Sequence, residues 1–338
     1  MCGIFGLIAP DVSREVLTRL SDRLAHRGPD DAGVYLGEGV GLAARRLSII
    51  DPAGGHQPLS DAAGAVWITY NGEVFNAPAL RDELRALGHG FRTQADTEVV
   101  VQAYVQWGEA AVGRLRGMFA FGLWDAPRRR LLLARDRFGI KPLYYARSGE
   151  RFAFASEVRP LLEALPELPR RLSAAALARL LRWGFIPSPL TAVDGVLKLP
   201  AAHTLVVEAG QATLRRYWQL TYPLNGGHRR PPPAEAATEF VARLREAVAA
   251  WRLSDVPLGA LLSGGVDSAA LAALLSELGG PIHTFTIGFE AASHDETAPA
   301  REIARYLGSR HTPLTFTTAD FDRLPEVVRR LEEPQCSA

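Results

Sequence analysis

Short apolar runs separated by turn residues dominate the first two thirds of the chain. The runs AVWITYNGE, FAFGLWD, RLLLARD and RFAFASE have strand length and turn signals around them. Helical spacing of apolar residues interrupts these runs near Val16–Ala25 and Ala77–Leu87, and a third helix is expected after Asp96. Strands bounded by turns, with a few helices between them, predict a mixed, largely antiparallel α+β domain over residues 1–220.

The pattern changes after residue 220. Residues 221–235 contain NGGHRRPPPAE, where Gly, Pro and basic residues cluster without periodicity, as they do in linkers. From residue 236 to 338 helix and strand patterns alternate. The expected elements are a helix over Ala236–Trp251, a strand over Val256–Leu262, a helix over Ser268–Leu278, a strand in IHTFTIGF and a helix over Thr297–Leu307. This alternation predicts an α/β domain with a parallel, doubly wound sheet, here incomplete.

The composition fits a globular protein with a core and no strong electrostatic field. Of the 338 residues, 47% are hydrophobic and 22% are charged, and the formal net charge is +1. Neither nucleic acid nor an anionic membrane is therefore expected as a partner. The apolar stretch Val256–Leu278 has Asp267 and two glycines in its middle, which indicates a buried strand, loop and helix rather than a membrane span.

The two cysteines, Cys2 and Cys336, are too few for a disulfide framework, and no signal-peptide pattern opens the chain, so a cytoplasmic setting is expected. Cys336 suggests no role. Cys2 and Gly3 are small enough for the initiator methionine to be removed, which would give Cys2 a free α-amine. With a pKa near 8, that amine can take the thiol proton, so one residue would supply both nucleophile and base. Position alone is equally compatible with an inert thiol at the start of a buried strand.

Seven motifs occur in order along the first part of the chain: MCGIFG, HRGPDD, ARRLSIID, YNGEVFN, ADTEVV, GMFAFGLWD and RDRFGIKPLYY. Together they resemble the glutaminase domain of class II amidotransferases, whose nucleophile is an N-terminal cysteine, over roughly residues 1–215. The resemblance implies layered antiparallel sheets flanked by helices, with Cys2 as the nucleophile. Asn71 offers a side-chain amide and Gly72 a backbone N–H, and the resemblance assigns both to the oxyanion hole. His26 and Arg27 are expected to be structural.

Glutamine also carries a carboxylate and an ammonium group that need partners. Arg46 suits the carboxylate, and Glu73 and Asp96 suit the ammonium. Taken singly, each of these is more often a solvated charge or an ordinary ion pair, and only its place inside a matched motif favours binding. The glutamine-binding residues implied by the resemblance are Arg46, Leu47, Ser48, Ile49, Ile50, Asn71, Gly72, Glu73 and Asp96.

A second motif, LLSGGVDSAAL, lies between an expected strand and an expected helix. Its two glycines allow a sharp turn that points N–H groups at an anion, and Ser263 and Ser268 add hydroxyl groups. SGGVDS is similar to the pyrophosphate loop of ATP pyrophosphatases, which cleave ATP to adenylate a substrate; no Walker motif occurs. The implied ATP-binding residues are Leu261, Ser263, Gly264, Gly265, Asp267, Ser268 and Ile287. Leu261 and Ile287 are equally expected as core residues of parallel strands.

Asp267 would lie beside phosphates only with a cation between them, so Mg²⁺ is expected to enter with ATP, and no separate metal site is expected. A glutaminase followed by such a loop resembles the glutamine-hydrolysing asparagine synthetase family. The resemblance implies ATP-dependent adenylation of aspartate, amidation by ammonia to give asparagine, and a homodimer. A second acidic glycine motif of the SGEGxDE type is absent from the sequence, so we expect a truncated chain that hydrolyses glutamine without making asparagine.

Two alternatives stay open. One is a related amidotransferase that amidates another carboxylate, in polysaccharide or secondary metabolism. The other is a non-catalytic regulatory module that binds glutamine or ATP, which a retained Met1 would favour because it blocks the α-amine of Cys2. Sugar-phosphate amidotransferases share the first domain, but SGGVDS argues against them.

Overall fold

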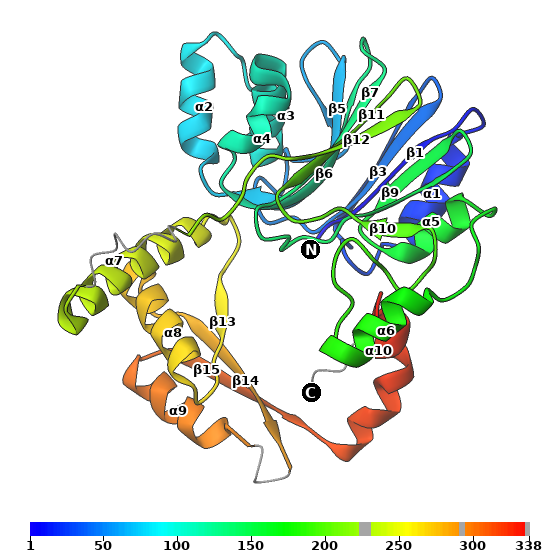
Figure 1. Ribbon diagram of the computed structural model, residues 1–338. Helices are drawn as coiled ribbons and strands as arrows, with labels where there is room; N and C mark the ends of the chain where they lie inside the picture. The colour runs from blue at the N-terminus through cyan, green and yellow to red at the C-terminus, as the bar shows by residue number, and fades with distance from the viewer. Residues whose placement is uncertain (223–230, 291–294, 335–338) are drawn as a thin grey trace. The chain divides into compact units, whose positions relative to one another are not determined.

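The computed structural model describes residues 1–222, 231–290 and 295–334. The chain divides into two compact units, one formed by Met1–Thr221 with the residues from Glu332 on, the other by Tyr222–Leu331 (Figure 1). Residues 223–230 of the expected linker, and Cys336, lie outside the described residues. Among the described helices, none is long and apolar enough to cross a membrane.

The first unit contains two six-stranded antiparallel sheets. The order of one sheet is β10-β8-β9-β1-β3-β2, and that of the other is β12-β11-β7-β6-β5-β4. The first sheet consists of β1 (Gly3–Ile8), β2 (Asp31–Gly37), β3 (Val40–Arg46), β8 (Tyr144–Ser148), β9 (Arg151–Ala155) and β10 (Val196–Lys198). The second consists of β4 (Leu59–Ser60), β5 (Val66–Val74), β6 (Gly117–Asp125), β7 (Arg130–Arg135), β11 (His203–Glu208) and β12 (Gln211–Arg216). The expected antiparallel α+β architecture is confirmed.

Helices cover the outer face of each sheet. The helices of this unit are α1 (Arg14–Asp22), α2 (Ala77–Ala86), α3 (Asp96–Trp107), α4 (Ala111–Arg114), α5 (Val158–Ala164) and α6 (Ala174–Trp183), with a 3₁₀ turn at Gly108–Ala110. The expected helices near residues 77 and 96 are confirmed. The helix expected to reach Ala25 ends at Asp22, because the following residues make three-residue turns, such as the bond from Ala25 N to Asp22 O.

Three layers of apolar side chains hold this arrangement together. One fills the space between the two sheets, and the others lie between each sheet and its helices. The position of strand β1 explains why its sequence is almost continuously apolar. Ile4 packs between the sheets, whereas Phe5 and Leu7 pack with Leu17 of α1, so both faces of the strand are buried.

The two sheets approach closely around Phe154. A Cβ atom on Gly6 would lie 2.1 Å from Cε1 of the Phe154 ring, and one on Gly122 of the facing sheet would lie 2.1 Å from its Cζ. The ring therefore fills the space that two missing side chains leave, and both positions require glycine.

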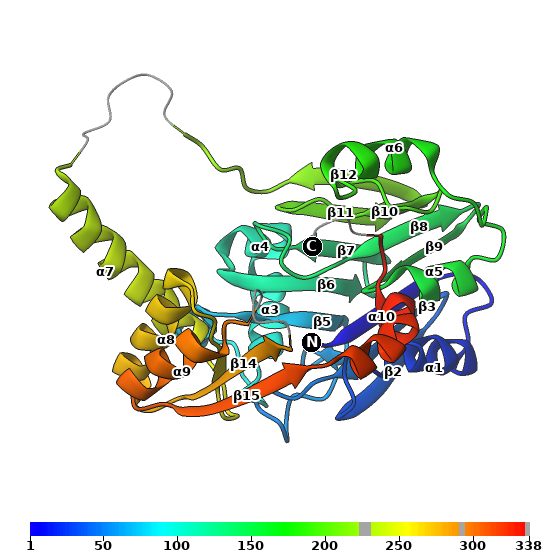
Figure 2. The ribbon, with the colours of Figure 1, turned by 90° about the horizontal axis from the view of Figure 1, so that it is seen from below.

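The second unit is a parallel sheet with helices. Its strands, in the order β13-β14-β15, are β13 (Gly259–Leu261), β14 (His283–Phe289) and β15 (Arg310–Phe316). Its helices are α7 (Pro233–Trp251), α8 (Val266–Gly279), α9 (Thr297–Tyr306) and α10 (Leu324–Arg330), with a 3₁₀ segment at Thr318–Arg323. Helices α8 and α9 lie on one face of the sheet, where Ala272 packs with Ala300 and Ala304 (Figure 2). The expected alternation is confirmed, although β13 is shorter than its apolar run.

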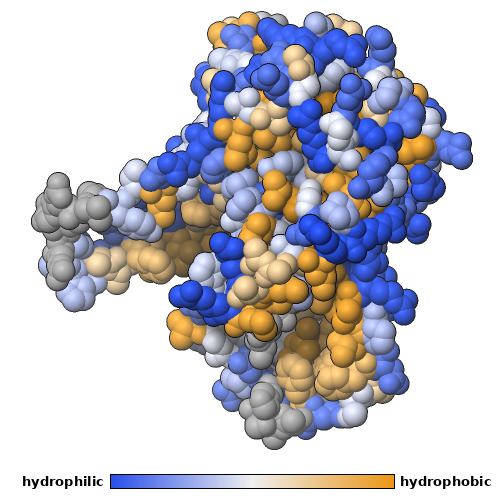
Figure 3. All heavy atoms as spheres, turned by 45° about the vertical axis from the view of Figure 1, so that its right-hand side comes forward, coloured by the Kyte–Doolittle hydropathy of each residue, from blue (hydrophilic) through white to orange (hydrophobic). Residues whose placement is uncertain are grey.

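The core of the second unit is small. It consists of Leu262 and three alanines, with Ile282, Ile303 and Leu307 packed at its margin. Many large apolar side chains of this unit are exposed instead, including Phe240, Leu261, Val266 and Leu314. Figure 3 shows apolar side chains at the surface on one face of the molecule.

We predict that Gly122→Ala lowers the free energy of unfolding by about 1–3 kcal/mol, because its methyl group would overlap the Phe154 ring between the sheets. Urea denaturation followed by circular dichroism measures the change. Gly113→Ala is the matched control, since a Cβ atom there meets nothing within 4 Å. Equal stability of the two variants would contradict this account of the packing.

Candidate active site

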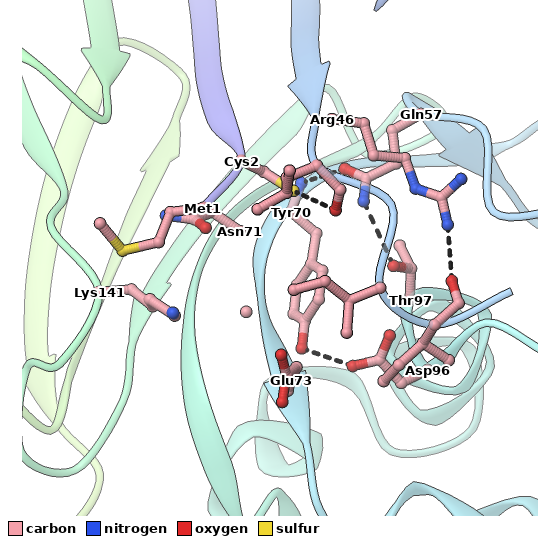
Figure 4. A pocket seen from close by; sticks show the side chains of 14 residues that line it. Met1, Cys2, Arg46, Gln57, Tyr70, Asn71, Glu73, Asp96, Thr97 and Lys141 are labelled. Atoms are coloured by element: carbon pink, nitrogen blue, oxygen red, sulfur yellow. Dashed lines mark hydrogen bonds between the residues drawn. The ribbon is translucent and has the colours of Figure 1, made fainter. Parts of the chain in front are cut away.

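A pocket in the first unit brings together most of the residues that the sequence singled out. Its lining includes Cys2, Arg46, Leu47, Ile49, Ile50, Asn71, Gly72, Glu73 and Asp96 (Figure 4). Ser48 does not line it; its backbone N–H donates to Asp30 Oδ2 instead, at 2.8 Å. Met1, Gln57, Tyr70, Thr97 and Lys141 also line the pocket and were not predicted.

Both sheets supply this pocket. Cys2 directly precedes β1 and Arg46 ends β3 in one sheet, whereas Asn71, Gly72 and Glu73 lie in β5 of the other. Asp96 is the first residue of α3. The motifs are far apart in sequence, and strand pairing within each sheet with packing between them brings them to one place.

Cys2 is held by its backbone and is half-buried. Arg27 Nε donates to the carbonyl oxygen of Cys2 at 3.2 Å, and Glu157 binds both Arg27 and His26, which is the structural arrangement expected of the HRGPD motif. The Cys2 thiol donates to Leu47 O at a sulfur–oxygen distance of 3.8 Å. Burial raises the pKa of the thiol, although Arg46 and the chain's amino group oppose this, so a nucleophilic role for this thiol would require a base.

Asn71 and Gly72 offer hydrogen-bond donors beside Cys2. Asn71 is only 1% exposed, and within the described part of the chain its Nδ2 makes no hydrogen bond. A buried donor without a partner costs about 1–3 kcal/mol, so this one is suited to a ligand's oxygen atom. A Cβ atom at residue 72 would lie 2.4 Å from Met118 O, so the close strand contact there requires glycine.

Arg46 shapes the loop that borders the pocket. Its Nη2 donates to Ile50 O at 2.6 Å and to Asp51 O at 2.8 Å, and its Nη1 donates to Pro52 O at 3.1 Å. A guanidinium group has five N–H donors, and these bonds use three of them. Arg46 is therefore a loop anchor, and two of its N–H donors remain for the carboxylate that the sequence predicts it to bind.

Asp96 is a buried carboxylate with fixed donors. Its Oδ2 accepts from Tyr70 OH and from Val74 N, both at 2.8 Å. Burial raises the pKa of Asp96, and these bonds act against that shift. Arg81 fixes the preceding loop through Thr93 O and Ala95 O. The carboxylate is thus oriented before any ligand arrives.

Glu73 and Lys141 bring opposite charges to the pocket. Burial raises the pKa of Glu73, and Lys141 lowers it. Burial likewise lowers the pKa of Lys141, and Glu73 raises it. Both residues stand in motifs that sequence analysis singled out, and Lys141 is one of only two lysines in the chain. That scarcity was a usable signal for Lys141, whereas Gln57, which accepts from Tyr70 N at 2.8 Å, gave none.

The glycine loop of the second unit lies between β13 and α8. Ser263 Oγ is 2.8 Å from Ser268 Oγ and accepts from Gly265 N at 3.2 Å. The N-cap residue of α8 is Gly265, which has no side chain that could accept a hydrogen bond. The N–H groups in the first turn of α8 therefore receive no side-chain cap from it. Hydroxyl and N–H groups thus gather where a phosphate would lie.

The two predicted adenine-side residues are not in the core. Leu261 is 77% exposed and Ile287 is 54% exposed, at the carboxyl ends of β13 and β14. The expectation that they are core residues is wrong, because the layer of side chains that would cover this end of the sheet is absent among the described residues. Within those residues, no group of three or more His, Cys, Asp or Glu side chains forms a metal site.

Comparison with known proteins adds independent findings. Residues 1–218 match the family model described as a glutamine amidotransferase domain, and residues 239–338 match the one described as asparagine synthase. Asparagine synthetase [glutamine-hydrolyzing] 1 of Bacillus subtilis (strain 168) is 34% identical over 99% of this chain and 53% of its own length. A putative asparagine synthetase [glutamine-hydrolyzing] 2 of Methanocaldococcus jannaschii is 32% identical over 96% of this chain and 66% of its own length.

A solved structure also matches. The structure titled "allosteric regulatory enzyme of purine biosynthesis" aligns with a TM-score of 0.51 at 14% identity, covering 94% of this chain and 80% of that one. This similarity shows the fold alone. The chain spans about half the length of the first curated relatives it matches, from 53% to 56%.

We predict that Tyr70→Phe lowers the free energy of unfolding by about 1–3 kcal/mol at neutral pH, because buried Asp96 loses a donor. The bond stabilises the ionised carboxylate, whose pKa is already raised by burial and rises further in the variant. The loss is therefore complete above this pKa and shrinks as the pH falls through it. Urea denaturation at neutral and acidic pH measures this.

Tyr104→Phe is the matched control for this experiment. Tyr104 OH donates to the buried Asp125 at 3.0 Å, and neither residue lines the pocket. The pKa of Asp96 is unaffected in this control. If the loss of unfolding free energy in Tyr70→Phe does not change with pH, the hydrogen bond to Asp96 is not what Tyr70 contributes to stability.

Proposed function

We propose, since this chain belongs to the glutamine amidotransferase family, that its first unit hydrolyses glutamine with Cys2 as the nucleophile. The observation that carries the proposal is the pairing of Cys2 with an unsatisfied, buried Asn71 amide in one pocket. An amidase needs such a donor, because the amide oxygen becomes an oxyanion when the thiol adds to the carbon.

The nucleophile would be activated by its own α-amine. Met1 lines the pocket beside Cys2, and its removal would free that amine. The amine takes the thiol proton as Sγ bonds to the carboxamide carbon of glutamine, while Asn71 Nδ2 and the N–H of Gly72 bind the oxyanion. The C–N bond then breaks as the α-ammonium gives a proton to the departing amide nitrogen, which leaves as ammonia. Water attacks the thioester, the C–S bond breaks, and glutamate and the thiol are released.

Charged groups of the pocket would bind the amino-acid end of glutamine. The two N–H donors of Arg46 that remain beyond its loop bonds suit the carboxylate, and Glu73 and Asp96 suit the ammonium group. Leu47, Ile49 and Ile50 line the walls between these groups. Ser48, which does not line the pocket, would contribute only through its place in the loop.

The second unit would bind ATP at the glycine loop. Ser263, Ser268 and the free N–H groups of α8 suit the phosphates, and exposed Leu261 and Ile287 suit the apolar faces of the base. Asp267, in the first turn of α8, could hold Mg²⁺ together with the phosphates, where the ion would neutralise their charge.

The whole reaction we propose is the glutamine-dependent amidation of aspartate to asparagine. Ammonia from the first unit would displace AMP from aspartate activated by ATP. The names of the relatives, asparagine synthetases that hydrolyse glutamine, and the match of residues 239–338 support this assignment. We also propose that the protein is cytoplasmic and forms a homodimer.

We predict that the chain, incubated with glutamine, releases glutamate, and that Cys2→Ala abolishes the release. Glutamate and asparagine are quantified separately with aspartate and ATP·Mg present, and intact mass spectrometry shows whether Met1 is removed. Glutamate that persists in Cys2→Ala, or a fully active chain that keeps Met1, would refute the proposed nucleophile.

We predict that Asn71→Ala lowers kcat for glutamine hydrolysis by about 10²–10³-fold, because the oxyanion loses a donor that the pocket leaves unpaired. KM should change much less, since the oxyanion exists only after attack. Asn76→Ala is the control, because Asn76 bonds to backbone groups of Arg114 and Arg116 and does not line the pocket. A rise in KM alone would place Asn71 in substrate binding.

A further inference from the structure

Lys141 is a nearly buried cation whose ammonium group lacks a close partner. Its residue is only 8% exposed and lines the pocket. Within residues 1–222, 231–290 and 295–334, its Nζ makes no hydrogen bond and no ion pair within 4.0 Å, whereas the other lysine, Lys198, donates to Ile186 O at 2.7 Å. Because Lys141 lines the pocket, its charge lies beside the other pocket groups without being bonded to any of them, and its effect on them is electrostatic.

The loop before β8 fixes Lys141 in place. Asp136 is fully buried and accepts backbone N–H groups from Phe119, Phe138, Ile140 and Lys141. Arg135 Nε donates to Lys141 O at 2.8 Å, so both backbone polar groups of Lys141 are held. The ammonium group is thus carried by a rigid support and not by a mobile loop.

The ammonium faces Glu73 across the pocket. Figure 4 shows Lys141 reaching into the pocket from the side opposite Asp96, with Glu73 between them. The charged groups that act on Glu73 are Lys141, Asp96 and the chain's amino group. Those that act on Lys141 are Glu73, Cys2, Arg27 and Asp136. Glu73 is therefore the acidic residue with the strongest electrostatic interaction with Lys141.

We propose, in an inference that rests on the proposed function, that Lys141 is a positioning residue that keeps Glu73 charged and its oxygen atoms free for the ammonium group of an α-amino acid. A direct ion pair would occupy the oxygen atoms of Glu73. A cation held beyond bonding distance stabilises the carboxylate and leaves those oxygen atoms to the ligand. The buried Asp96 carboxylate would otherwise oppose the ionisation of half-buried Glu73.

The test measures glutamine affinity as a function of pH. Calorimetry on the full chain carrying Cys2→Ala avoids turnover, and Lys141→Met is then added to it. Without the lysine, the pKa of Glu73 rises, so the carboxylate is neutralised, and affinity lost, at a higher pH than in the parent. We expect affinity at mildly acidic pH to fall about tenfold, which corresponds to a shift of about one pKa unit.

Matched variants separate this role from a structural one. Lys198→Met removes the other lysine outside the pocket and should leave the affinity profile unchanged, whereas Lys141→Arg should restore most of it. Adding Lys141→Met to Glu73→Gln should have little further effect, since no carboxylate remains to be kept charged. Lys141→Gln repeats the measurement with a polar side chain if Lys141→Met does not fold.

Several results would overturn the inference. These are an unchanged pH profile in Lys141→Met, tighter binding in that variant, or an undiminished effect in the Glu73→Gln background. A changed alkylation rate of Cys2 by iodoacetamide, with glutamine affinity unaltered, would assign Lys141 to the thiol instead. A chain that binds glutamine with the expected profile but does not hydrolyse it would sustain the inference and refute the proposed function. Failure of Cys2→Ala to bind glutamine would refute both.

Discussion

The close packing of two antiparallel sheets is the constraint on which the rest of the molecule depends. Phe154 sits between Gly6 and Gly122, and that contact fixes how β1 and its neighbours face β6 and β5. Cys2 enters from one sheet and the Asn71–Glu73 segment from the other. The pocket therefore exists only when the sandwich is fully packed, and no single sheet contains it.

Burial works against charge throughout this pocket. It raises the pKa of Cys2, Glu73 and Asp96, and it lowers that of Lys141. Every one of these groups is thus pushed toward its neutral form, and only neighbours and hydrogen bonds resist. The zwitterionic ligand proposed above would bring a positive and a negative charge of its own, and these would add to the counter-charges that the pocket groups already provide for one another.

Much of the fold could be predicted from the sequence, because turn residues and apolar spacing are local signals. The antiparallel domain and the parallel sheet both follow from them. Eight of the nine residues that motifs led us to expect at the glutamine site line the pocket, as does Cys2, but the pocket also uses Tyr70, Gln57 and Lys141. Their contribution depends on which strands face each other, which no local pattern contains. The exposure of Leu261 and Ile287 was unpredictable for a similar reason, since an apolar residue type does not reveal whether other side chains pack over it.

Arg46 fixes the loop that follows β3 through its backbone. It donates hydrogen bonds to the carbonyl oxygens of Ile50, Asp51 and Pro52. Every residue type has a carbonyl group, so these three bonds do not depend on the side chains of Ile49 and Ile50, which line the pocket, whereas the Asp51 side chain also holds the loop by accepting from Gly54 N and Gln94 N. Evolution or a protein engineer can therefore exchange the side chains that face the pocket while these bonds hold the loop. The same anchor that makes the loop rigid makes its chemistry adaptable.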